Sequence, residues 1–210
     1  MAANMGLIAK KCFPNATQVT DRFHVQKLAL EALQEIRIKY RWKAIDKENK
    51  AIEKAKKLNE KFESEVLDNG DTLKQLLARS RYFLYKNDSK WSENQKDRAA
   101  LLFKLYPDIQ KAYDLAQDLR NIFEKTTDKI IGLSRLAKWH EKVNQSGFKS
   151  FNTISRSIMN HYQTILNYFD NRSTNASAES FNAKIKAFRA QFRGVRNVAF
   201  FLFRLTNIYA

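Results

Sequence analysis

The sequence predicts a mainly α-helical fold, and three observations support that prediction. Helix breakers are scarce, since the 210 residues include 5 Gly and 2 Pro. Apolar residues recur over long stretches at the 3.6-residue period of a helix. Hydrophobic residues make up 44% of the chain, which is enough to fill a core in one large domain or two small ones.

The N-terminal third of the chain contains the first three expected elements. A helix is expected over about residues 5–12, where the sequence FPN stops it. A short strand follows at about 17–20, because ATQVT has the β-branched content that strands favour. A long helix then runs from near His24 toward Val66. Its stretch IRIKYRWK alternates apolar and basic residues, as a strand does, but strong helix formers flank it on both sides.

Turn and capping signals divide the remainder into further helices. DNGD at 68–71 predicts a turn, and NQSGF at 144–148 predicts a break between two helices. The capping-box pattern SENQ predicts a helix start at Ser92, and Pro107 suits a first helical position. DNRSTNAS at 170–177 predicts the last long loop.

The charge of the chain narrows the class of partner. There are 38 Lys and Arg residues against 22 Asp and Glu, for a formal net charge of +16. So large an excess predicts a polyanionic partner, most often nucleic acid and less often an acidic membrane surface. The longest wholly apolar run, VAFFLF, is too short to span a membrane, and no signal peptide is expected. The single cysteine, Cys12, excludes an internal disulfide and fits a reducing cytosol, so a cytoplasmic location is expected.

The basic helix near the C-terminus has the sharpest pattern of the chain. One face carries an apolar stripe that must bury against something: Phe181, Ile185, Phe188 and Phe192. The opposite face carries a polar row: Glu179, Asn182, Lys186, Arg189 and Arg193. From Arg172 to Arg204 there are seven Lys and Arg residues and only one acid. A solvated face normally mixes both signs of charge, whereas a face that follows phosphates does not.

Two carboxylates are candidate metal ligands. Glu179 lies at the N-terminal end of the basic helix, where a negative charge also interacts favourably with the helix dipole. Asp21, in VTDRFHV, ends the expected strand, and α/β folds place their sites at such strand ends. The alternative role for Asp21 is a helix N-cap. His24 is a candidate base or ligand, although three His and one Cys give no zinc-ligand spacing.

Two blocks of the sequence resemble bacterial insertion-sequence transposases of the DDE type. These blocks are FPNATQVTDRFHVQKL and TNASAESFNAKIKAFRAQFRGVRNVAFFLFRL. The nearest pattern is that of the ISL3-like group, with D-R-F-H after a strand and T-N-x-x-x-E-x-x-N-x-x-I-K before a basic helix. LLFKLYPDIQKAYDLAQDLRNIF and NYFDNRSTNASAES are also similar to that group, so the resemblance covers nearly the whole chain.

The resemblance implies an RNase H-like core in which two Asp and one Glu bind two divalent metals, Mg²⁺ or Mn²⁺. Asp21 corresponds to the second Asp and Glu179 to the Glu. Two such ions, about 3.5 to 4 Å apart, activate the attacking oxygen and stabilise the leaving 3′ oxygen. In related cut-and-paste transposases a basic residue seven positions after the Glu contacts DNA, and Lys186 has that offset. The expected DNA-contacting residues are Arg172, Asn175, Asn182, Lys184, Lys186, Arg189, Arg193 and Arg196.

The resemblance also implies how the chain is divided. Residues 1–27 are expected to be a remnant of the RNase H-like core, with one short strand and the second Asp. Residues 28–170 form a helical insertion, and 171–210 form the Glu-bearing helix and the C-terminal helix of the core. The first Asp of such enzymes lies on an earlier strand, and residues 1–20 contain no Asp or Glu. The chain is therefore expected to be a carboxyl-terminal fragment that is inactive alone.

The expected partners are transposon-end DNA and target DNA, in a nucleoid-associated bacterial protein, and the sequence leaves a homodimer open. Two other interpretations remain. In one, the chain is a basic helical DNA-binding protein, derived from a transposase, without catalytic activity. In the other, it is a helical scaffold whose charged helix over 36–66 pairs with another helix.

Overall fold

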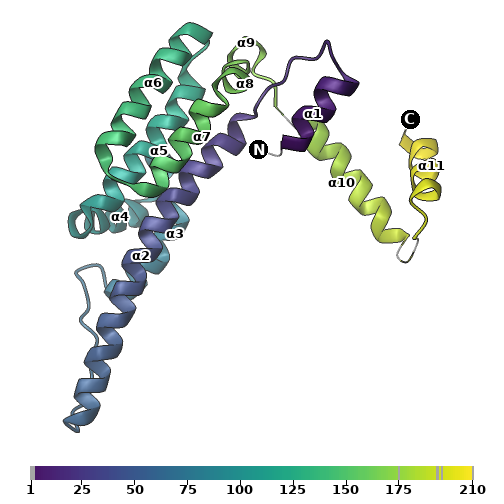
Figure 1. The fold of residues 1–210 in the computed structure, drawn as a ribbon. Coiled ribbons are helices and arrows are strands. Elements are labelled where there is room, and N and C mark those ends of the chain that lie inside the picture. Colours follow the sequence, from purple (N-terminus) through teal and green to yellow (C-terminus); the bar gives the residue numbers. More distant parts are fainter. Residues whose placement is uncertain (1–2, 175, 193, 195, 210) are drawn as a thin grey trace. The chain divides into compact units, whose positions relative to one another are not determined.

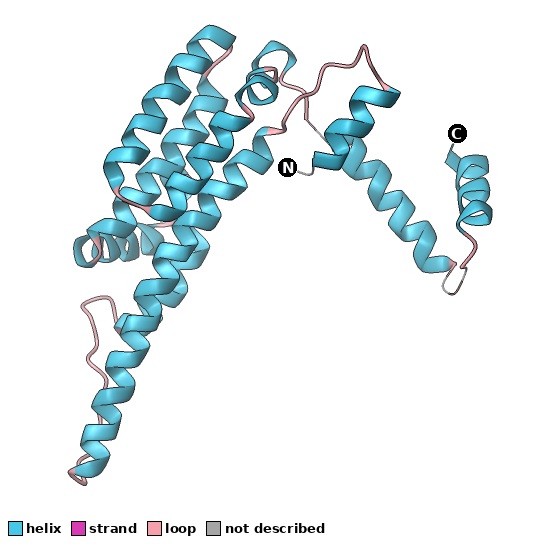
Figure 2. Cartoon of the chain, in the orientation of Figure 1, coloured by secondary structure: helices cyan, strands magenta, loops and turns pink. Residues whose placement is uncertain are grey.

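The computed structural model is built almost entirely of α-helices, as the sequence predicts (Figure 1, Figure 2). It describes residues 3–174, 176–192, 194 and 196–209. The helices are α1 (Ala3–Cys12), α2 (Arg22–Lys57), α3 (Leu73–Leu84), α4 (Glu93–Leu105), α5 (Pro107–Lys125), α6 (Lys129–Ser146), α7 (Lys149–Asn160), α8 (Tyr162–Leu166), α9 (Tyr168–Asn171), α10 (Ala176–Gln191) and α11 (Val198–Tyr209). A 3-10 turn, η1 (Asp88–Lys90), precedes α4. The chain divides into two compact units, Met1–Asn171 and Arg172–Ala210.

Most of the helix boundaries follow the local signals in the sequence. The predicted turn at 68–71 is confirmed, and Gly70 adopts a positive φ of 79° there. At the start of α4 the Ser92 N–H donates to the Gln95 side-chain oxygen at 3.3 Å, as a capping box requires. Pro107 is the first residue of α5. The predicted break at 144–148 is also confirmed, because Gly147 ends α6 in the left-handed conformation.

The strand expected at 17–20 is wrong. The segment is extended but, among the residues that the structure describes, it has no neighbouring strand; an isolated bridge instead joins Val66 and Thr72. Backbone groups of residues 18–20 bond to the helical region 164–167. The Thr20 N–H and the Gln18 carbonyl are thus hydrogen-bonded without a sheet.

The long helix ends at Lys57 rather than near Val66. Asn59 has a φ of 54°, a left-handed conformation that Asn adopts more readily than most residues. The Glu60 N–H then donates back to the Ala55 carbonyl at 2.9 Å, a bond typical of a closed helix end. The helix stops here because its last carbonyls are satisfied by this turn.

The last loop is shorter than the predicted 170–177. α9 extends to Asn171 and α10 begins at Ala176. The Lys129 ammonium donates to the Asp170 carboxylate at 3.0 Å, which links the end of α9 to the start of α6. That ion pair helps to keep Asp170 within a helix.

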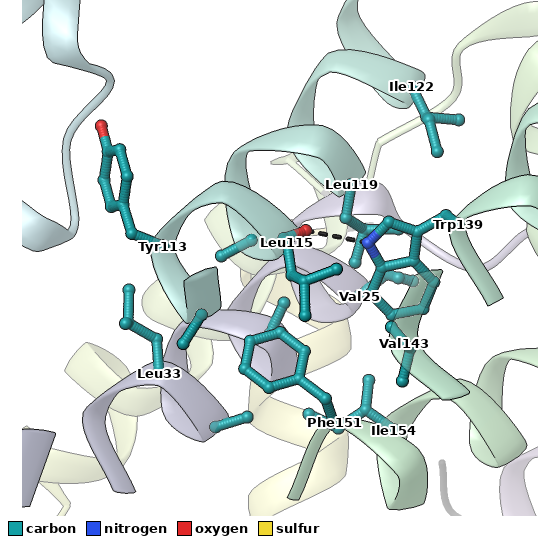
Figure 3. Packing of buried hydrophobic residues seen from close by; sticks show 14 of the residues in the cluster. Val25, Leu33, Tyr113, Leu115, Leu119, Ile122, Trp139, Val143, Phe151 and Ile154 are labelled. Atoms are coloured by element: carbon teal, nitrogen blue, oxygen red, sulfur yellow. Dashed lines mark hydrogen bonds between the residues drawn. The ribbon is translucent and has the colours of Figure 1, made fainter. Parts of the chain in front are cut away.

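The core of the first unit lies along α2 and α5, which α3, α4, α6 and α7 surround. Figure 3 shows Trp139 of α6 within this core, where its indole N–H donates to the Leu115 carbonyl of α5 at 2.8 Å. Gly132 allows α9 to approach α6 closely, since a Cβ at that position would lie 2.7 Å from the Phe169 ring. This packing fixes α9 against α6, while the segment before α2 bonds to α8 and to Asn167, the residue between α8 and α9.

The second unit consists of α10 and α11, which pack through aromatic rings. Phe188 is 4% exposed, and its ring centroid lies 5.4 Å from that of Phe201 and 4.5 Å from that of Phe192. The expectation that the whole apolar stripe of α10 is buried is confirmed at Phe188 and wrong at Phe181, which is 46% exposed. Among the described residues, the ring contact that α11 makes with this stripe is at Phe188, in the C-terminal half of α10, and Phe181 stays accessible.

Candidate functional site

Asp21 occupies the point where the extended segment becomes α2. Its side-chain oxygen accepts a hydrogen bond from the Phe23 N–H at 2.8 Å, and its carbonyl accepts one from the His24 N–H at 3.1 Å. The residue is 7% exposed. The structure thus gives Asp21 the N-cap role that the sequence left as its alternative.

The residues before Asp21 are fixed by contacts with α8 and the residue that follows it. The Thr20 N–H donates to the Thr164 carbonyl at 2.8 Å, and the two threonine hydroxyls lie 2.8 Å apart. The Asn167 side-chain amide donates to the Gln18 carbonyl at 3.0 Å, while its oxygen accepts from Lys129 at 2.7 Å. Asp21 therefore stands on a segment that is bonded to the helical part of its own unit.

His24 does not extend a ligand set around Asp21. Its ring is exposed and makes an edge-to-face contact with Phe23, with ring centroids 6.3 Å apart. Across the described residues, no group of three or more His, Cys, Asp or Glu side chains could hold a metal ion.

Glu179 lies in the first turn of α10 and is exposed. A carboxylate at that position interacts favourably with the positive end of the helix dipole, typically by about 0.3 to 1 kcal/mol. Asp21 belongs to the first unit and Glu179 to the second. As donors both suit a hard divalent cation such as Mg²⁺, which proteins usually bind through one or two carboxylates while waters and substrate phosphates complete its octahedral shell.

The cations expected to contact DNA are largely accessible. Lys186 and Arg189 lie on the same side of α10, three residues apart, and both are exposed. The other exposed members of the expected set are Arg172, Asn182, Lys184 and Arg196. Asn175 and Arg193 lie outside the described residues. α10 therefore presents several exposed cations together with one acid, in its first turn.

Comparison with known proteins identifies the family of this chain. A family model described as a transposase, of the ISL3-type DDE group, matches residues 1–205. The chain belongs to the ISL3-like family of DDE transposases. No curated protein and no solved structure matches it.

Membership of the ISL3-like family connects the chain with transposition of insertion sequences and with DNA recombination. Transposases of the DDE type generally use divalent metal ions and act on DNA. Among the described residues, no helix combines the length and apolar character that crossing a membrane needs.

Sequence reasoning missed the residues that hold the Asp21 segment in place. Thr164 and Thr20 are 144 positions apart, and no local pattern in the sequence marks either as the partner of the other. It also missed a row of cations on α6, Arg135, Lys138 and Lys142, which lines a cavity between α5 and α6. Their spacing of three and four residues is visible in the sequence, but the pairing of the two helices is not.

Proposed function

We propose that this chain is the carboxyl-terminal part of the catalytic region of an ISL3-like transposase, and that the cationic face of α10 binds DNA. The observation that carries the proposal is the run of exposed cations, including Lys186 and Arg189, behind a single acid on α10. Exposed cations without acids among them attract phosphates and release counterions when they bind DNA. The net charge of +16 favours the same partner.

In this proposal Asp21 and Glu179 are the second and third carboxylates of a metal-dependent DNA cleavage and strand-transfer site. Residues 1–27 and 171–210 belong to an RNase H-like core, and 28–170 are a helical insertion within it. The first Asp comes from a segment that is not among these 210 residues, so the isolated chain is inactive. Without the first Asp, Mg²⁺ or Mn²⁺ binds weakly or not at all, and the first Asp raises the metal affinity.

A second candidate function is DNA binding without catalysis. It is favoured by one observation, since the Asp21 carboxylate caps α2 and so has a structural role already. Cleavage by a protein that also contains the first Asp distinguishes the two candidates. The longer protein cleaves DNA only in the first.

The DNA-binding proposal is tested with Lys186→Ala/Arg189→Ala in the 210-residue chain. Lys54→Ala/Lys57→Ala is the matched control, because it also removes two exposed cations three residues apart at the end of a helix. Fluorescence anisotropy with labelled duplexes is expected to show weaker binding for the α10 variant with every DNA sequence. Equal affinities of the α10 variant and the control would remove α10 from the DNA interface.

Sedimentation of the chain with and without transposon-end DNA measures whether two copies associate.

A further inference from the structure

The first unit contains a cavity of about 350 Å³ between α5 and α6. Ligand pockets typically have volumes of about 300 to 1,000 Å³, so the cavity is large enough for a small ligand group. The residues that line it recur at the same helical spacing on both helices, at i, i+3, i+4 and i+7. Each helix therefore presents one continuous stripe to the cavity.

The floor of the cavity is apolar and rigid. Ile122 of α5 is 8% exposed and Trp139 of α6 is 2% exposed, and both line the cavity. The indole N–H of Trp139 is held by the Leu115 carbonyl at 2.8 Å (Figure 3). This hydrogen bond orients the buried indole, which gives the floor a defined apolar surface.

The rim of the cavity is cationic. Four exposed side chains, Lys125, Arg135, Lys138 and Lys142, line it together with one carboxylate, that of Asp118. Arg135, Lys138 and Lys142 follow one another at three and four residues on α6, so they share one side of that helix. Cations gathered around a concave surface raise the local concentration of anions.

Arg135 is oriented by the end of α5. Its Nη1 group donates to the Thr126 hydroxyl at 2.8 Å and to the Lys125 carbonyl at 3.2 Å. A guanidinium has five N–H donors, and these two bonds involve a single nitrogen. Because the side chain is already positioned, binding of an anion costs less conformational entropy.

The two ends of the cavity differ in charge. At one end the Lys142 ammonium donates to the Asp118 carboxylate at 2.7 Å, which neutralises that cation. Burial raises the pKa of the neighbouring Asp114, and the charges of Asp118 and Asp88 raise it further, so this end is unfavourable for an anion. The opposite end holds Lys125, Arg135 and Lys138. An anion is expected there.

We infer that this cavity, the α5–α6 groove, binds a phosphate of the DNA backbone, as a contact separate from the face of α10. Arg and Lys are the side chains that bind phosphodiester oxygens, and a guanidinium does so with paired N–H groups. The sugar lies over the apolar floor, and the phosphate lies at the end formed by Lys125, Arg135 and Lys138. The helical unit thus holds the duplex independently of Glu179.

The test is Lys125→Ala/Lys138→Ala in the 210-residue chain, measured by fluorescence anisotropy with a labelled 30-base-pair duplex. Loss of two of the three cations around that phosphate is expected to lower affinity by about 5- to 10-fold at 0.1 M salt and to reduce the salt slope by about 1. Lys54→Ala/Lys57→Ala removes the same charge elsewhere and is expected to change affinity less than threefold. Both substituted lysines are exposed, so the thermal midpoint of unfolding is expected to stay constant.

Two further measurements separate this site from α10 and from a site for free phosphate. Lys186→Ala/Arg189→Ala combined with the groove variant is expected to give additive losses, because independent contacts add. If the groove variant keeps wild-type affinity while the α10 variant loses affinity, the groove inference is wrong and the α10 proposal stands. If the groove variant loses affinity while the α10 variant keeps it, the α10 proposal is wrong and the groove inference stands.

Inorganic phosphate at millimolar concentration is expected to compete only weakly with the duplex. Saturable phosphate binding that Lys125→Ala/Lys138→Ala abolishes without affecting DNA binding would overturn the assignment to DNA.

Discussion

Thr20 and Thr164 are joined twice, by a backbone hydrogen bond of 2.8 Å from the Thr20 N–H to the Thr164 carbonyl and by their hydroxyls, 2.8 Å apart. These contacts connect the residue before Asp21 to α8. The Thr164 hydroxyl also lies 3.0 Å from the His161 carbonyl. The position of Asp21 therefore depends on a helix that is distant in the sequence.

Removal of the Thr164 hydroxyl is expected to loosen this connection. Thr164→Val retains the shape and loses the bond to Thr20, so the free energy of unfolding falls by about 0.5 to 1.5 kcal/mol. Thr153→Val is the matched control, because Thr153 also bonds back within its own helix, to the Lys149 carbonyl at 3.1 Å. Denaturant unfolding measures both variants. Equal losses would mean that the contact with Thr20 adds no stability.

Substitutions of Asp21 separate its capping role from its charge. Asp21→Ala removes the acceptor of the Phe23 N–H and is expected to cost about 0.5 to 2 kcal/mol of stability. Asp21→Asn is expected to cost less, since Asn is an equally good N-cap residue. Thermal unfolding distinguishes the two variants. An Asn variant as unstable as the Ala variant would show that the negative charge, rather than the cap, stabilises this helix start.

Acid is expected to weaken the ion-pair cluster around Asp71, which is fully buried and bonds to Arg79 and to Arg98, the latter at 2.8 Å. Burial alone would raise the pKa of Asp71, but the hydrogen bonds and charges of Arg98 and Arg79 outweigh it and lower the pKa below 3.8. A lowered folded-state pKa gives stability that is complete above the unfolded value and is lost as pH falls through the folded value. Stability should therefore decline below about pH 4.

Asp71→Asn tests this cluster. It is expected to lower the free energy of unfolding at pH 7 by about 1 to 3 kcal/mol, because both arginines are partly exposed and keep some solvation. Urea unfolding at several pH values should also show a shallower acid dependence in the variant than in the wild type. Parallel pH profiles would assign the acid sensitivity to other carboxylates.

Elements with local signals could be predicted from the sequence. The start of α5 at Pro107 and the end of α6 at Gly147 each depend on one residue whose backbone preference is strong. The structure of residues 17–20 could not be predicted from a local signal of this kind. β-branched residues predict an extended backbone, but the partner that satisfies it is a helix 144 positions later rather than a strand.

The candidate site was only partly predictable for the same reason. The spacing of Lys186 and Arg189 places both on one side of α10 whatever surrounds that helix. The α5–α6 groove depends on which helices pack together, which the spacing of Lys125 or Arg135 within its own helix does not reveal. How much of the α10 stripe is buried depends on how far along α10 the ring contacts of α11 extend. The sequence of α10 alone does not determine this.

DNA binding by the 210-residue chain is expected to depend strongly on salt and weakly on sequence. If about five cations of α10 and its flanks neutralise phosphates, log K falls with log salt at a slope of about −4 to −5, and the groove contacts make it steeper. Titrations between about 50 and 200 mM salt with duplexes of unrelated sequence measure both properties. A slope near zero, or strong preference for one sequence, would contradict a backbone-contacting surface.

The most direct test of the central claim is cleavage by a protein that joins this chain to a segment with the first Asp. Glu179→Gln in that protein keeps the side-chain shape and removes the charge. We expect it to abolish nicking of transposon-end DNA in Mn²⁺ and to leave DNA binding unchanged or slightly tighter. Glu141→Gln, at an exposed position of α6, is the matched control and should cleave normally. If Glu179 only interacts with the helix dipole, the substitution lowers the free energy of unfolding by at most about 0.3 to 1 kcal/mol. Normal cleavage by the Glu179→Gln protein would contradict a catalytic role for Glu179.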